Sequence, residues 1–258
     1  MIFNKFFILF KIGRKIGKSN IVNIISETHK IPIFIKIFFN LLSFSFSSSK
    51  DTKSHSKDHL SASIQEMGTT FIKLGQFLAT RPDIIGEKLS KELESLQDKL
   101  PPFSKKEAEK IIIENLGQSN FDDIIDLSEP IAAASIAQVH KAKIKEDNII
   151  KNVAIKVLRP NIKKIFNEEI DAIMLLAYIV ESLITKTKRL KLIEVVFLFK
   201  EITNHEMDLR FEAAAANEYA ENTKNDVGFR VPQIYWNFTS ENVMTLDWVE
   251  GISIRETE

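Results

Sequence analysis

The stretch IAAASIAQVHKA, residues 131–142, is followed by VAIKV at residues 153–157, and these two runs decide the fold. Both are rich in small and β-branched apolar residues, and the polar segment KEDN, residues 145–148, lies between them. Two such runs around a short polar turn predict a β-hairpin. Because alternate residues of a strand point to the same face, Ala154, Lys156 and Leu158 are expected to share one face of this hairpin.

The rest of the chain is predicted to be mostly helical. Apolar residues at helical spacing predict helices over residues 61–85, with Pro82 marking an end, and over residues 87–100, 104–117, 161–184 and 193–223. Ser104 and Glu107 form a capping-box pattern, and Gly117 marks the end of that helix. The segment 231–251 is expected to return to two strands around residues 239–242. This order of helices, hairpin, helices and hairpin predicts an α+β fold with a small antiparallel sheet.

Composition excludes several classes of site. The 258 residues are 44% apolar and 27% charged, which suits one large globular domain or two modest ones. There is no cysteine, so disulfides, thiolate metal sites and cysteine nucleophiles are excluded. The five histidines form no HExxH pattern and no cluster with metal-ligand spacing.

The formal net charge of zero conceals a basic, apolar N-terminal arm, residues 1–49. Residues 1–50 contain seven Lys and one Arg against a single acid, Glu27, which is a net charge of +7. The longest uncharged run, residues 37–49, is shorter than the roughly 20 apolar residues that a membrane-spanning helix needs. We expect an arm that lies at a membrane surface, where Phe and Ile insert and Lys meets anionic lipid headgroups. A helix packed on the domain with its lysines outward is the alternative.

Two further properties of the N-terminal region bear on its role. The serine- and lysine-rich residues 50–60 are expected to form a linker, because they have little apolar surface to bury. A nucleic-acid-binding arm is disfavoured, because the arm has a single arginine and no polar aromatic residues interleaved for base stacking.

Lys156 is the first candidate for chemistry. An ammonium among Val153, Ile155 and Val157 requires an anionic partner, which ATP phosphates and a helix glutamate could supply. The alternative is an edge-strand lysine that protects the sheet from aggregation. The alanine-rich loop Ala132–Ser135 precedes this strand by one hairpin, the spacing expected of a phosphate loop, and the Ser135 hydroxyl could donate to a phosphate. The alternative is a strand or helix that happens to be rich in alanine.

An acidic segment, HEMDLRFEAAAANEY at residues 205–219, is the second candidate. On a continuous helix, Asp208 and Glu212 would share a face, with Glu201 and His205 close to it. A solvated acidic face is the simpler interpretation. A carboxylate-bridged metal cluster would need a Glu-x-x-His motif on two helices, and Glu201 with His205 has the wrong spacing and no second copy.

The third candidate is FIKLGQ, residues 71–76, which places Lys73 and Gln76 on one helix beside Gly75. A polar pair next to a glycine suggests close approach of a ligand or of another backbone. The alternative is a glycine that lets two helices pack closely.

Taken together, these motifs resemble the UbiB/ADCK atypical kinase-like family, which is associated with coenzyme Q biosynthesis. The resemblance covers residues 60–258 and rests on five motifs in the family's order. They are the K-x-G-Q motif at Lys73, Gly75 and Gln76; the alanine loop at Ala132, Ala133, Ala134 and Ser135; the ATP-site lysine Lys156; the E-x-D motif at Glu206 and Asp208 with the lysine-pairing Glu212; and the hinge TLDWVEG at residues 245–251, with Asp247 and Val249 at the nucleotide.

The resemblance implies a kinase-like N-lobe over residues 129–258, with a helical extension over residues 61–128 that carries the K-x-G-Q motif. It implies ATP binding, with slow ATP hydrolysis or phosphoryl transfer to a small molecule, and Mg²⁺ as the accompanying ion. Lys73, held near the E-x-D carboxylates, would restrain ordinary protein-kinase activity. The implied partners are membrane lipids or quinone precursors and other proteins of ubiquinone biosynthesis, at the cytoplasmic face of a bacterial inner membrane or at a mitochondrial inner membrane.

The catalytic groups of phosphoryl transfer are expected elsewhere. A catalytic-loop Asp, a metal-binding Asn and a second metal-binding Asp should follow the hinge, yet the 258 residues contain no HxD pattern and no D-F-G. We therefore expect the N-terminal portion of such a protein, without the C-lobe and its Mg²⁺ ligands and inactive alone, with a separate C-lobe chain as a possible partner. A non-catalytic membrane-associated scaffold, or the remnant of a decayed gene, is the alternative.

Overall fold

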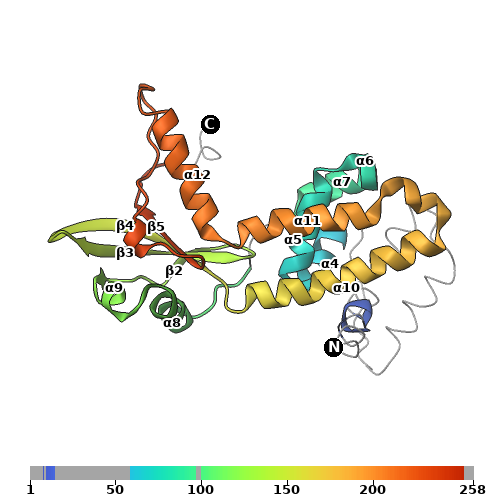
Figure 1. Ribbon diagram of the computed structural model, residues 1–258, viewed down its shortest axis with the longest axis horizontal. Helices are drawn as coiled ribbons and strands as arrows, with labels where there is room; N and C mark the ends of the chain where they lie inside the picture. The colour runs from blue at the N-terminus through green and yellow to red at the C-terminus, as the bar shows by residue number, and fades with distance from the viewer. Residues whose placement is uncertain (1–7, 9, 15–58, 97–99, 253–258) are drawn as a thin grey trace. The chain divides into compact units, whose positions relative to one another are not determined.

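The protein consists of two compact units in the computed structural model, which describes residues 8, 10–14, 59–96 and 100–252 (Figure 1). The helical unit comprises Met1–Asp98 and Lys163–Ile202, and the sheet unit comprises Lys99–Ile162 and Thr203–Glu258. The boundary expected after residue 128 does not coincide with this division, because the helices over residues 105–122 pack with the sheet.

From residue 59 onward, the described part of the helical unit contains α-helices and a 3₁₀ turn. They are α4 (His59–Met67), α5 (Thr69–Ala79), α6 (Pro82–Ile85), α7 (Glu87–Glu94), α10 (Ile162–Leu183), η1 (Thr185–Leu190) and α11 (Leu192–Glu206). Leu60, Leu89, Leu93 and Leu96 form one buried cluster between α4 and α7. Phe199 of α11 forms a second centre, with its ring centroid 5.6 Å from that of Phe77 and 5.7 Å from that of Phe166.

Two glycines determine where a helix breaks and where two segments pack closely in the helical unit. Gly68 has a φ of 101°, which separates α4 from α5 within the predicted stretch 61–85. Gly75 lies where α5 meets its neighbours, and a Cβ there would collide with the side chain of Leu96. The interpretation of Gly75 as a helix-packing glycine is therefore sufficient to explain it.

The sheet unit contains an antiparallel sheet. Its strands are β1 (Ile124–Ile125), β2 (Pro130–Ala133), β3 (Ala137–Glu146), β4 (Ile149–Leu158) and β5 (Val243–Asp247), in the order β1-β3-β4-β5 with β2 also paired to β3. The remaining elements of the unit are α8 (Lys105–Leu116), α9 (Gln118–Asp122), α12 (Leu209–Asn222) and η2 (Trp236–Phe238).

One face of the sheet is the core of this unit. Val153, Ile155 and Val157 of β4 are fully buried and cluster with Ile112 of α8 and Val243 of β5. Helix α8 begins with the predicted capping box, since the Ser104 hydroxyl accepts from the backbone N–H of Glu107 and the Glu107 carboxylate accepts from that of Ser104. The opposite face of β4 carries Lys156, so the strand alternation separates core from candidate site.

The α+β fold and the central hairpin are confirmed, because β3 and β4 pair in register from Ala137 opposite Leu158 to Glu146 opposite Ile149. Helix α10 matches its expected range within one residue at each end. The helix expected over residues 87–100 ends at Glu94.

Two other expectations are wrong. The helix expected over residues 193–223 is two helices, α11 and α12, separated at Met207–Asp208. In the hairpin expected over residues 231–251, only the second strand forms, as β5. In place of the first strand, Ile234 forms a single β-bridge to Leu246, and the 3₁₀ turn η2 follows.

The arm predicted over residues 1–49 lies outside the described residues except for residue 8 and residues 10–14, which are helical. The linker predicted over residues 50–60 also lies outside them, apart from His59 and Leu60, which belong to α4. Among the helices of the described residues, none combines the length and apolar character that crossing a membrane requires.

Candidate functional site

Lys156 and Glu212 form the centre of the candidate site. The Lys156 Nζ donates to both carboxylate oxygens of Glu212, at 2.8 and 2.7 Å. The lysine side chain is 25% exposed and the glutamate 50%, so the pair lies at the surface of the sheet unit and is open to a ligand. The predicted pairing of these two residues, 56 positions apart in the chain, is confirmed.

The start of α12 places Glu212. Asp208 is the N-cap of this helix, and its carboxylate accepts from the backbone N–H of Arg210 at 3.1 Å and from the Arg210 guanidinium at 2.9 and 2.7 Å. The buried Leu209 donates its backbone N–H to the carbonyl of Glu241, just before β5. The expectation that Asp208 and Glu212 share a helix face is wrong, because Asp208 caps the helix and has extended backbone angles.

The alanine loop is a tight connection between β2 and β3. Ala132 and Ala133 belong to β2 and pair with Val139 and Gln138. The backbone N–H of Ala134 donates to the carbonyl of Ala137 at 2.8 Å, which closes the turn. Ser135 is fully buried, so the predicted contact of its hydroxyl with a phosphate would require the loop to move.

The sheet face beside Lys156 carries mostly apolar side chains, together with Lys141, which lies opposite Ala154. In the strand register Lys156 lies opposite Val139 of β3 and Met244 of β5, and Ala154 lies opposite Leu246. Directly opposite residues of antiparallel strands share a face, so these small and apolar side chains form a slab next to the ammonium. Strand alternation in the sequence predicts Ala154 on this face but not Val139, Met244 and Leu246, because their alignment depends on the register.

Asp247, expected at the nucleotide, is a structural hub at the end of β5. Its carboxylate accepts from the Tyr235 hydroxyl at 2.6 Å, from Arg230 at 3.0 Å and from the backbone N–H of Gln233 at 3.3 Å. Burial raises the pKa of Asp247, but these three donors outweigh it and hold the pKa below its ordinary value. Burial, followed by the bond to Asp247, raises the pKa of Tyr235.

The hinge residues after β5 are also fastened to the sheet. The backbone N–H of Trp248 donates to the carbonyl of Asn152 at 3.0 Å. The Lys141 ammonium lies 4.5 Å from the centre of the Trp248 ring. Val249, the other hinge residue expected at the nucleotide, is 55% exposed.

Comparison with known proteins agrees with this geometry. The family described as the ABC1 atypical kinase-like domain matches residues 95–258. The chain belongs to this family. The match includes the alanine loop, the Lys156–Glu212 pair and the hinge, and therefore the whole sheet unit from α8 onward.

Relatives in the ABC1 family extend the similarity toward the N-terminus. The chain is similar to proteins named "Probable protein kinase UbiB". It is 33% identical to the one from Marinobacter nauticus over 88% of this chain and 41% of the relative, and 31% identical to the one from Pseudomonas aeruginosa over 97% and 46%. It is 35% identical to the one from Cellvibrio japonicus over 77% and 36%. The chain thus spans less than half the length of these relatives.

The K-x-G-Q residues of this ABC1 family member lie on α5 of the helical unit. Lys73 and Gln76 are partly exposed on either side of the packed Gly75. Glu206 and Asp208 belong to the sheet unit, so the approach of Lys73 to these carboxylates would join the two units and stays a prediction.

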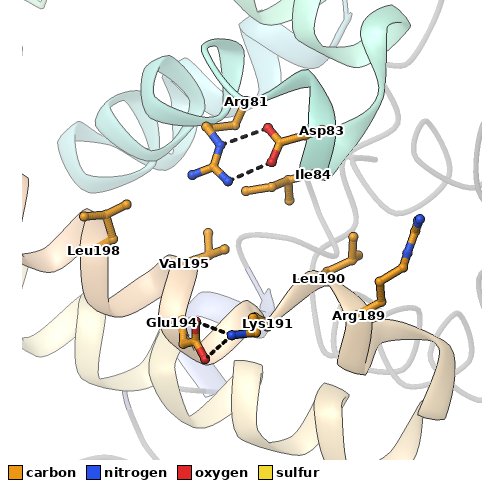
Figure 2. Close-up of a pocket in the computed structure, with 9 residues that line it drawn as sticks. All are labelled: Arg81, Asp83, Ile84, Arg189, Leu190, Lys191, Glu194, Val195 and Leu198. Atoms are coloured by element: carbon orange, nitrogen blue, oxygen red, sulfur yellow. Dashed lines mark hydrogen bonds and ion pairs between the residues drawn. The ribbon is translucent and has the colours of Figure 1, made fainter.

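The helical unit also contains a pocket of about 330 Å³, lined by parts of α6, η1 and α11 (Figure 2). Ile84, Leu190, Val195 and Leu198 supply its apolar lining. Its charged residues are largely paired: Arg81 binds Asp83 at 2.7 Å and Lys191 binds Glu194 at 2.9 Å. None of the residues predicted for the site lines this pocket.

In the part of the chain that the structure describes, no three acidic or histidine side chains are grouped to hold a metal ion. The groups that fit ATP are an ammonium held by a carboxylate, a short loop beside it and an apolar strand face.

Proposed function

We propose that this chain carries the ATP-binding part of an atypical kinase-like protein, and that it acts in ubiquinone biosynthesis at a membrane. The observation that carries the proposal is the Lys156–Glu212 ion pair, 2.7 Å long, on a sheet whose alanine loop takes the position of a phosphate loop. Its occurrence in a member of the ABC1 atypical kinase-like family supports ATP as the ligand.

Each part of the site has a role in this proposal. The Lys156 ammonium binds phosphate oxygens, and Glu212 holds it in place, since a flexible lysine is otherwise free to swing away. The slab of Val139, Ala154 and Leu246 offers a flat apolar surface to the adenine base. The alanine loop, with its small side chains, permits close approach of the triphosphate.

The reaction and its setting belong to the proposal for the whole protein. Bound ATP, with Mg²⁺, would be hydrolysed slowly or would transfer its phosphoryl group to a small molecule. The partners are membrane lipids or quinone precursors and other proteins of ubiquinone biosynthesis. We place the protein peripherally at the cytoplasmic face of a bacterial inner membrane, or at the mitochondrial inner membrane in a eukaryote.

The test is nucleotide-dependent thermal stabilisation of the 258-residue chain, with and without Mg²⁺. A ligand at about 100 times its Kd stabilises the folded state by about 2.7 kcal/mol, which a melting curve resolves readily. We expect ATP to raise the Tm of the wild type. In Lys156→Ala we expect most of this increase in Tm to be lost.

The matched control is Lys143→Ala. Lys143 is also a sheet lysine with a 2.8 Å ion pair, to Asp126, but it lies near the other end of β3. This variant should keep the full ATP-dependent shift. An equal loss in both variants, or no shift in the wild type, would contradict ATP binding at Lys156.

A further inference from the structure

Arg159 is the first residue after β4, three positions beyond Lys156, and its guanidinium binds backbone carbonyls on two separate segments. Nε and Nη2 donate to the carbonyl of Ala134, at 3.1 and 2.8 Å. Nη1 donates to the carbonyl of Pro101 at 3.0 Å, and Nη2 lies 3.4 Å from that of Leu100. One side chain therefore joins the alanine loop to the segment Leu100–Phe103, which we name the strap.

Both backbone polar groups of Ala134 are hydrogen-bonded. Its N–H is bound to the carbonyl of Ala137, and its carbonyl accepts two N–H groups from Arg159. The backbone N–H of Arg159 also donates to the carbonyl of Ile136 at 2.8 Å. Both the backbone and the side chain of Arg159 thus fix the conformation of the turn.

The strap is held from a second side by Gln138, the second residue of β3. Its Oε1 accepts from the backbone N–H of Phe103 at 2.9 Å, and its Nε2 donates to the carbonyl of Phe103 at 3.2 Å. Nε2 also lies 2.9 Å from Nε2 of His140, whose Nδ1 is 2.8 Å from the carbonyl of Ser128. A carbonyl only accepts, so Nδ1 carries the proton and Nε2 accepts from Gln138.

Proline explains why the strap depends on these side chains. Pro101 and Pro102 have no backbone N–H, so this segment cannot donate to a strand at either position. Its carbonyls instead accept hydrogen bonds from Arg159. The planar guanidinium group of an arginine can donate to several acceptors at once. The strap begins two residues after Asp98, where the chain leaves the helical unit that carries Lys73, Gly75 and Gln76.

We propose that Arg159 is a positioning residue that fixes the alanine loop and couples it to the strap, so that movement of the strap changes nucleotide affinity at Lys156. The nucleotide part of this inference rests on the proposed function. The coupling of strap and loop does not, because it follows from contacts within the sheet unit.

The test is amide hydrogen exchange of the ligand-free 258-residue chain, comparing wild type with Arg159→Lys. A lysine keeps the charge but lacks the planar guanidinium group, so it cannot donate to the carbonyls of Ala134 and Pro101 at the same time. We expect exchange at Ala134, Ala137 and Phe103 to accelerate by about tenfold or more, while the buried ladder residues Ile144 and Ile155 stay protected. The matched control Arg189→Lys, an exposed arginine of the helical unit, should leave all five amides unchanged.

A second variant tests the coupling without substituting Arg159 or any residue of the loop. Pro101→Gly loosens only the strap, and we expect it also to accelerate exchange at Ala134 by several-fold. Unchanged exchange at Ala134 in both variants would overturn the inference. Acceleration across the whole sheet, including Ile144 and Ile155, would show a general loss of stability and would equally overturn it.

ATP-dependent stabilisation then separates this inference from the proposed function. We expect Arg159→Lys to weaken ATP affinity by about tenfold while Lys156 and Glu212 remain paired. If wild type does not bind ATP but the exchange pattern is as expected, the proposed function fails and the strap–loop coupling stands. If wild type binds ATP and Arg159→Lys binds it equally well, the effect on affinity is refuted.

Discussion

The two ends of strand β3 are both turns, but different forces hold them. At one end Asp147 and Asn148 join β3 to β4, with φ values of 50° and 62°. Two-residue hairpin turns with positive φ at both positions favour Asn and Asp, so this turn is encoded by the residues that form it. At the other end the loop around Ala134 contains none of these residues and is held by Arg159, 25 positions away.

This difference separates a structural turn from the loop at the candidate site. A turn encoded locally forms with its hairpin and has one conformation. A loop held by distant side chains can change when those side chains or their other partners move, which suits a segment that must meet a ligand. The candidate nucleotide site lies at the end of β3 where the local sequence does not fix the conformation of the turn.

The largest effect is expected from the core that both ends share. Ile155 is fully buried between β3, β5 and α8, and Ile155→Ala should lower the free energy of unfolding by about 2–5 kcal/mol, measured by urea denaturation. Ile149→Ala, at the 59% exposed start of the same strand, should change it by less than about 0.5 kcal/mol. Similar losses in both variants would mean that the buried centre of β4 does not contribute more to stability than its exposed start.

A smaller effect is expected at the locally encoded turn. Asn148→Val forces a β-branched residue to adopt a φ of 62°, which should cost about 1–2 kcal/mol of stability, whereas Asn148→Gly should be nearly neutral. Denaturant melts measure both. Hydrogen exchange at Ala134 should not respond to either variant, and a response there would show that the two turns are not independent.

The smallest effect is expected from pH, through the histidine that supports the strap. Burial lowers the pKa of His140, and this outweighs the opposing bond to the carbonyl of Ser128 and the charge of Glu129. The folded state therefore binds its proton less readily than the unfolded chain, whose histidines titrate near about 6.5. Stability from this group is complete above that pH and is lost as the pH falls below it.

The measurement is the free energy of unfolding between pH 7.5 and pH 5, in wild type and in His140→Gln. The glutamine variant should start less stable at pH 7.5, because it loses the Ser128 bond, but its stability should fall less steeply with acid. Equal slopes in the two proteins would contradict a neutral His140 in the fold.

The sequence by itself determined what depends on neighbours along the chain. The β3–β4 hairpin follows from two apolar runs around residues 145–148, the start of α8 from the Ser104–Glu107 box, and the separation of Lys156 from the core from strand alternation. The pairing of Lys156 with Glu212 also came from the sequence, although only through motifs that resemble a family.

Tertiary structure alone decided the contacts that shape the site. The helix break at Met207–Asp208 follows neither a proline nor a glycine, and the strap is joined to the loop by bonds that span 35 and 58 residues. Side-chain donors such as those of Gln138 and Arg159 bind whichever carbonyls the fold brings within about 3 Å, and no periodicity in the sequence encodes that distance. Local pattern therefore specifies the strands and turns, while the conformation of the alanine loop depends on which distant backbone groups meet it.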